Sequence, residues 1–116
     1  MTTMDYIIDA KGKKLGRLAT EIAHILQGKQ SAGYRPNAVA KVRVLVKNCQ
    51  DLGLDSARSD KKIYYRHTGY MGHLKEATLA ERFARAPEQV VRDTVRHMLP
   101  KNFLNQKRLN NLKFVK

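Results

Sequence analysis

A stretch of cations and aromatic residues in the middle of the chain has residue types that could recognise a ligand. Residues 61–70 read KKIYYRHTGY. Two lysines and an arginine alternate with tyrosine and histidine rings, and a glycine follows them. Lysine and arginine neutralise phosphates, while a tyrosine or histidine ring can stack on an unpaired base or contact a ribose hydroxyl. Alternation along a strand turns one of Tyr64 and Tyr65 inward, so we expect only one to be exposed. This pattern is typical of RNA binding.

Arrangements that could carry catalysis are scarce. Gly12 and Gly16 precede a predicted helix, where free backbone amides could hold a phosphate. Their spacing matches neither a Walker loop nor a dinucleotide-binding loop, so we favour an ordinary turn with a basic rim. We therefore predict no catalytic residue and no enzyme. A small nucleotide-binding or phosphotransfer enzyme that uses residues 12–17 stays as an alternative.

The histidines and the cysteine do not form a metal site in the sequence pattern. The four histidines lack His-x-x-x-His spacing, and the single Cys49 has no cysteine near it. We predict that Cys49 is a small buried residue and that His24 and His97 lie on helix surfaces. No metal and no cofactor are expected.

Positive charge dominates the composition and is unevenly distributed. The 116 residues include 23 Lys+Arg and 10 Asp+Glu, for a net charge of +13, and the usual partner of such a chain is a polyanion. Residues 76–99 hold four basic and four acidic residues, whereas residues 100–116 hold five basic and no acidic ones. This segregation favours a phosphate-facing side over general solubility.

Other partners suit the sequence less well. The aliphatic runs are short, and the N-terminus lacks a secretory signal pattern, so we expect no membrane partner and a cytoplasmic location. No predicted helix concentrates basic residues on one face, as a reader of the DNA major groove would. A free-standing nucleic-acid-binding regulator is therefore disfavoured, and it stays as a second alternative.

The elements that position these residues follow from hydrophobic spacing. A helix is predicted from Leu15 to a stop at Gly28, and strands are predicted at residues 6–8 and 42–46 on either side of it. A strand, a helix and a strand in this order imply a right-handed parallel crossover. Further strands are predicted at residues 63–65 and 112–115.

A second helical region is predicted between Thr78 and Pro100. Thr78 and Glu81 fit a capping box, and Pro87 predicts a break and restart. The buried stripe of the second helix is predicted to be Val90, Val91, Val95, Met98 and Leu99. The length of the chain suits a single domain over residues 1–116, in which residues 100–116 form a basic C-terminal segment.

Several short blocks together resemble one known family over nearly the whole chain. They are Asp9-Ala10, LGRLA at 15–19, Gly28-Lys29, Tyr34-Arg35-Pro36, YRHTGY at 65–70, Leu74-Lys75 and MLPKN at 98–102. Their order and spacing resemble ribosomal protein thirteen of the large subunit, in its bacterial form. The resemblance implies a three-layer α/β/α domain with a short, mainly parallel sheet of about four strands. It also implies binding to large-subunit ribosomal RNA, neighbouring ribosomal proteins as partners, a role in subunit assembly, and no small-molecule substrate.

The predicted RNA contacts combine the charged positions with the family blocks. Cations are expected to neutralise phosphates, and the glycine-bearing loop is expected to make close contacts to RNA. The predicted set is Lys29, Tyr34, Arg35, Lys61, Lys62, Arg66, His67, Thr68, Gly69, Tyr70, Gly72, Lys75, Lys101, Asn102, Lys107 and Arg108.

Overall fold

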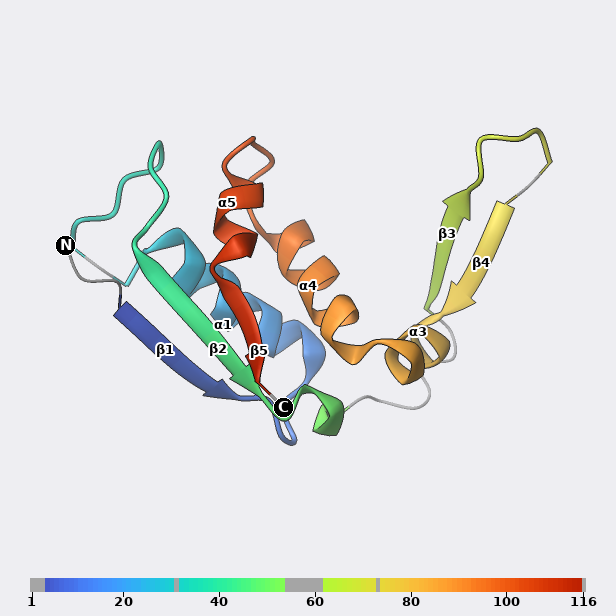
Figure 1. Cartoon of the computed structure of the whole chain (residues 1–116), viewed down its shortest axis with the longest axis horizontal. Coiled ribbons are helices and arrows are strands. Elements are labelled where there is room, and N and C mark those ends of the chain that lie inside the picture. Colours follow the sequence, from blue (N-terminus) through green and yellow to red (C-terminus); the bar gives the residue numbers. More distant parts are fainter. Residues whose placement is uncertain (1–3, 31, 54–61, 73, 116) are drawn as a thin grey trace.

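The computed structural model describes residues 4–30, 32–53, 62–72 and 74–115, which form a sheet, a cover of helices and a projecting hairpin (Figure 1). Among these residues, no helix combines the length and apolarity needed to cross a bilayer. In chain order the elements are β1 (Met4–Asp9), α1 (Leu15–Gln27), β2 (Val42–Lys47), η1 (Cys49–Asp51), β3 (Ile63–His67), β4 (Leu74–Thr78), α3 (Leu79–Arg85), α4 (Pro87–Met98), α5 (Asn105–Asn110) and β5 (Leu112–Val115).

The main sheet is parallel and has the order β1-β2-β5. Ile8 lies opposite Val46 in the β1–β2 register, and Val44 lies opposite Leu112 in the β2–β5 register. The predicted parallel crossover through α1 is therefore confirmed. The predicted strand at residues 112–115 is also confirmed, and it forms an edge of the sheet.

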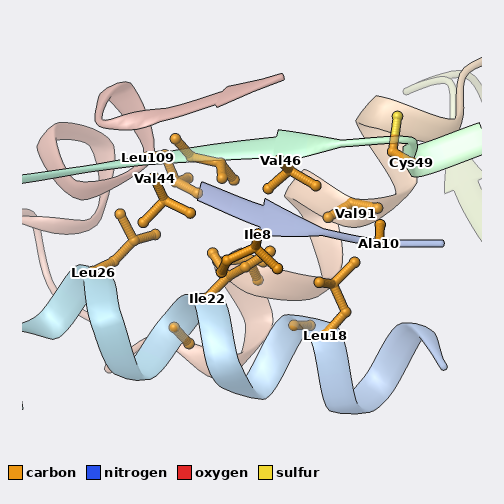
Figure 2. Close-up of a cluster of buried hydrophobic side chains, with 14 of the residues drawn as sticks. Ile8, Ala10, Leu18, Ile22, Leu26, Val44, Val46, Cys49, Val91 and Leu109 are labelled. Carbon is orange, nitrogen blue, oxygen red and sulfur yellow. The ribbon is translucent and has the colours of Figure 1, made fainter. Parts of the chain in front are cut away.

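One face of the sheet meets α1 and α4, and the side chains between them form the core (Figure 2). Strand alternation places Ile8, Val44 and Val46 on this face, where they pack with Leu18 and Ile22 of α1. Apolar burial of this kind contributes roughly 25 cal/mol per Å² removed from water. The helices α1 and α4 therefore cover this face of the sheet and hold it in place through the core.

The opposite face of the sheet is not covered by any described helix. Ile7 is 62 % exposed, while its neighbour Ile8 is 4 % exposed. On the same outer face, Arg43 donates to both carboxylate oxygens of Asp5, at 2.9 and 2.7 Å. The α/β class and the mainly parallel sheet are thus confirmed, but the described residues form two layers where three were expected.

The strand predicted at residues 63–65 exists but does not join the main sheet. It is part of β3, which pairs with β4 in a separate antiparallel hairpin. The main sheet consequently has three strands where about four were expected. Figure 1 shows the hairpin projecting away from the main sheet beyond α3.

Local signals fix the helix ends as predicted. Gly28 ends α1 with φ 80°, and its N–H bonds to carbonyls of the last turn. The Thr78 hydroxyl accepts a hydrogen bond from the Glu81 N–H at 3.3 Å, which starts α3, and Pro87 is the first residue of α4.

Two buried-residue predictions for this region have different outcomes. Met98, expected in the buried stripe, is exposed, and its sulfur accepts a hydrogen bond from the Thr20 hydroxyl at 3.4 Å. Cys49 is buried in the core as predicted, and its burial raises the pKa of its thiol.

Candidate nucleic-acid interface

Three loops lie along one edge of the molecule, and two of them carry exposed cations. Figure 1 shows the loop that precedes β2, the turn between α4 and α5 and the tip of the hairpin all on the upper side. The segment before β2 carries the exposed cations Lys29 and Arg35, and the turn between α4 and α5 carries Lys101. Residues 68–72 at the tip of the hairpin include no Lys or Arg, and the hairpin's exposed cations Arg66 and Lys75 lie on its strands. The fold therefore places parts of three predicted contact blocks on a single edge.

Most of the predicted contact residues are exposed. The exposed members are Lys29, Tyr34, Arg35, Lys62, Arg66, His67, Thr68, Gly69, Tyr70, Gly72, Lys75, Lys101, Asn102 and Lys107. Lys61 lies outside the described residues. Only Arg108 among the described members is buried.

Arg108 therefore differs from the expectation that it neutralises phosphate. It is 1 % exposed, so its guanidinium cannot reach a phosphate in this conformation. It donates to the Asn105 side-chain oxygen at 3.5 Å, and its Nε has no hydrogen-bond partner in the described part of the chain. Residues 105–110 form a helix whose inner face carries Arg108 beside Leu109, and this removes Arg108 from the basic surface.

The hairpin presents its cations on one strand face. Tyr64, Arg66, Lys75 and Ala77 share that face, because Tyr64 pairs with Ala77 and Arg66 pairs with Lys75. Gly69 has φ 90° in the loop between the strands, a conformation that favours glycine. The Gly69 N–H donates to His67 Nδ1 at 2.9 Å, which holds the histidine ring against the loop.

The two adjacent tyrosines have different surroundings, as alternation predicted. The Tyr64 ring lies against the Arg82 guanidinium, 4.4 Å from the ring centroid, and the Lys62 ammonium lies 5.3 Å from it. Tyr65 is 61 % exposed. One ring thus docks the hairpin onto α3, and the other is open to a ligand.

Between the hairpin and the helices α3 and α4 lies a groove with a volume of about 1000 Å³, which we call the hairpin groove. Arg66 and Lys75 stand on its hairpin wall, while Arg85 and Arg96 stand on its helical wall. Asp93 in the helical wall is engaged, because it accepts from Arg82 at 2.7 Å and from Gln89 at 3.0 Å. The other residues that line the groove are Tyr64, Tyr65, Glu76, Ala77, Glu81, Ala86 and His97.

A smaller pocket of about 380 Å³ lies at the junction of α4 and α5, and we call it the amide pocket. Its lining consists of Arg96, His97, Lys101, Asn102, Asn105, Gln106 and Leu109, with no carboxylate among them. A hollow lined by cations and amides suits an anionic group. Lys101 and Asn102 were predicted contacts, and the structure joins them to residues from α4.

Sequence reasoning missed the contribution of α3 and α4 to this surface. Arg85, Arg96 and His97 were not predicted contacts, because residues 76–99 have no net charge. The signal that could have found Arg96 is the helical spacing of residues 89, 93 and 96, which share one face of α4. Arg85 is the last residue of α3, so only the fold brings it beside that face. His97 is exposed, as predicted.

The turn before α1, which suggested the enzyme alternative, is occupied by contacts within the protein. The Gly12 N–H donates to the Asp51 carbonyl at 3.0 Å, and the Gly53 N–H donates to the Lys13 carbonyl at 3.0 Å. The Lys13 ammonium pairs with Glu21 at 3.3 Å. In the described ranges, no three His, Cys, Asp or Glu side chains are grouped so that they could hold a metal ion.

The fold and this surface define a small basic α/β protein whose cationic loops share one edge. The chain belongs to the ribosomal protein L13 family, since the family model described as "Ribosomal protein L13" matches residues 3–116. The family consists of structural ribosomal proteins and is not an enzyme family. The protein is accordingly a ribosomal protein of the large subunit, a component of a ribonucleoprotein that acts in translation.

Proposed function

We propose that this protein is a bacterial-type structural constituent of the large ribosomal subunit that binds large-subunit ribosomal RNA through its basic edge. The observation that carries the proposal is that the exposed cations of two loops, the one before β2 and the turn between α4 and α5, share that edge with the tip of the hairpin, beside a carboxylate-free pocket. Displacement of condensed counterions from phosphates by these cations would supply most of the affinity. The proposal includes a role in subunit assembly, in which the three loops hold RNA segments together.

The test is sedimentation of the tagged protein in a bacterial lysate. We expect it in the large-subunit fractions at moderate salt, and we expect it to dissociate at high salt, since phosphate contacts weaken as counterions are added. A variant with glutamine in place of Lys29, Arg35 and Lys101 should leave those fractions at lower salt than the parent protein. Absence of the unaltered protein from large-subunit fractions would contradict the proposal.

Assembly is tested separately by depletion of the protein from growing cells. Incomplete large-subunit particles should accumulate if the protein holds RNA segments together early. The triple variant, expressed as the sole copy, should reproduce that accumulation in part. Normal particle profiles after complete depletion would remove the assembly role and leave the binding role to the sedimentation test.

A further inference from the structure

The hairpin groove and the amide pocket are connected through two residues. Arg96 and His97 line both hollows, and both belong to the last turn of α4. In Figure 1, α4 and the hairpin diverge from α3, and the upper end of α4 reaches the turn before α5. A chain-like ligand could therefore pass from one hollow to the other over this end of α4.

The hairpin wall of the groove carries an unbalanced pair of charges. Arg66 and Lys75 lie directly opposite each other on paired strands, where like charges destabilise the pairing. No ion pair of either residue occurs within the described chain. An anion between the hairpin and α4 would relieve this repulsion and would also face Arg85 and Arg96.

The size of the hollows bears on the form of that ligand. Volumes of about 1000 and 380 Å³ are those of pockets for drug-sized molecules, which is the size of one or a few nucleotides. An A-form duplex is recognised across a wide, shallow groove by extended surfaces instead. The Tyr65 ring lies on the strand face opposite Arg66 and Lys75, but the ring of Phe103, which is 85 % exposed and follows Asn102 of the amide pocket, offers a face on which an unpaired base can stack.

We infer that a single unpaired RNA segment follows a continuous track through the hairpin groove, over Arg96 and His97, and into the amide pocket. The inference rests on the proposed function and adds the form of the RNA and the part of the protein that holds it. Arg66 and Lys75 contact the backbone at one end of this track, and Lys101 contacts it at the other. Arg96 is the shared contact between them.

The experiment measures binding of fluorescent oligouridylate of about 12 nucleotides to the full chain as a function of salt. Arg66→Gln, Arg96→Gln and Lys101→Gln should each reduce the slope of log K against log salt by about 0.7, the value for one phosphate contact to a single strand. When salt rises from 50 to 200 mM, the factor by which affinity falls should thus be about 2.6 times smaller for each variant than for the parent. Lys113→Gln, an exposed position on the outer face of the sheet, is the matched control and should leave the slope unchanged.

Stoichiometry and pairing distinguish the track from other arrangements. One long strand should bind per protein, whereas two separate sites would bind two. A fully paired RNA of the same length should bind at least about tenfold more weakly, because its bases cannot stack on the exposed Phe103 ring. Two long strands per protein, equal affinity for the duplex, or no binding of the oligouridylate would each overturn the inference.

The failure of the track and the failure of the proposed function give different results. If the track variants retain the parental slope while the protein still enters large-subunit fractions, the track is wrong and the function stands. If the unaltered protein does not enter those fractions, the proposed function fails whatever the oligonucleotide shows. Circular dichroism of each variant checks that these exposed substitutions leave the fold intact.

Discussion

At the scale of single residues, Arg108 combines a charge with a buried position. Its Nε lacks a partner among the described residues, and a buried unsatisfied donor costs about 1–3 kcal/mol. Arg108→Met keeps most of the packing volume and removes the donor, so the free energy of unfolding should rise by roughly that amount. Urea denaturation measures the change. A loss of stability would mean that the guanidinium has partners that the described chain does not supply.

The same variant tests the original expectation that Arg108 contacts phosphate. A side chain that is almost fully buried should not contribute to the salt dependence of RNA binding. The slope of log K against log salt should therefore equal that of the parent protein. A slope lower by about 0.7 would indicate that Arg108 leaves the interior when RNA binds.

Asp9 gives the stability of the fold a pH dependence. Hydrogen bonds from the Lys11 N–H and the Asn48 side-chain amide, both at 3.0 Å, hold the pKa of its carboxyl below the ordinary 3.8. A carboxyl whose pKa is lowered by folding stabilises the protein above its unfolded pKa, and this contribution is lost as pH falls through the folded pKa. Asp9→Asn keeps an acceptor and removes the charge.

The variant should accordingly unfold at a lower urea concentration than the parent at pH 7. The difference should shrink as pH falls below about 4 and should vanish below the folded pKa. Urea titrations at stepped pH values measure this. A difference that stays constant from pH 7 to acid would attribute the effect to packing instead of charge.

A substitution of Phe103, in the loop between α4 and α5, tests the contribution of base stacking to RNA binding apart from that of charge. It is 85 % exposed and follows Lys101 and Asn102, which line the amide pocket. Stacking of a base on an aromatic ring contributes about 1–3 kcal/mol, so Phe103→Ala should weaken RNA binding by roughly 5- to 150-fold. The slope with salt should not change, since no phosphate contact is removed. Unchanged affinity would show that the ring does not contact a base.

At the scale of elements, two glycines at opposite ends of α1 predict opposite effects of the same substitution. Gly28 has φ 80°, and a Cβ there would lie 2.8 Å from the Ala40 Cβ. Gly28→Ala should therefore destabilise the protein by about 1–2 kcal/mol or more. Gly16 is the second residue of the helix, and a Cβ added there would meet nothing within 4 Å, so Gly16→Ala should stabilise by about 0.4–1 kcal/mol because it restricts the unfolded chain. Thermal unfolding of both variants measures the pair, and shifts in the same direction would contradict the argument.

The elements also show which structural signals the sequence contains. The boundaries of α1, α3 and α4 were predictable because apolar spacing, a threonine cap and Pro87 act within a few residues of one another. The helix α5 was missed because residues 105–110 contain one apolar residue. The strand β4 was missed because LKEAT has little β-branched content, and it is held by pairing with β3. Pairing between segments is a tertiary property that the local sequence does not show. For the same reason, the sequence did not predict that β3 pairs with β4 outside the main sheet.

At the scale of the whole molecule, topology determines which charges act together. Sequence blocks predicted the loops that carry exposed cations, but the sum of charges over residues 76–99 concealed the role of α3 and α4. That sum is zero, yet Asp93 is engaged by Arg82, while Arg85 and Arg96 face the hairpin groove. A segment total cannot separate the faces of a helix, whereas the folded structure can.

The edge that gathers the loops lies apart from the outer face of the sheet, and this predicts a pattern of protection from chemical labelling. Lys47 and Lys113 follow the buried Val46 and Leu112, so alternation directs them to the outer face. Lys29 and Lys101 lie on the basic edge. When ribosomal RNA binds, amidination of Lys29 and Lys101 should slow severalfold, while that of Lys47 and Lys113 should stay at the rate of the free protein.

Mass spectrometry of the labelled chain, with and without RNA, measures all four rates in one sample. Because Lys47 and Lys113 share the net positive field of the chain, they control for nonspecific attraction, which would slow every lysine alike. That attraction weakens as salt is added, so the contrast between the two pairs of lysines should sharpen at moderate salt. Equal protection of all four lysines at moderate salt would mean that RNA also covers the outer face of the sheet, and the basic edge would then not be the sole RNA surface.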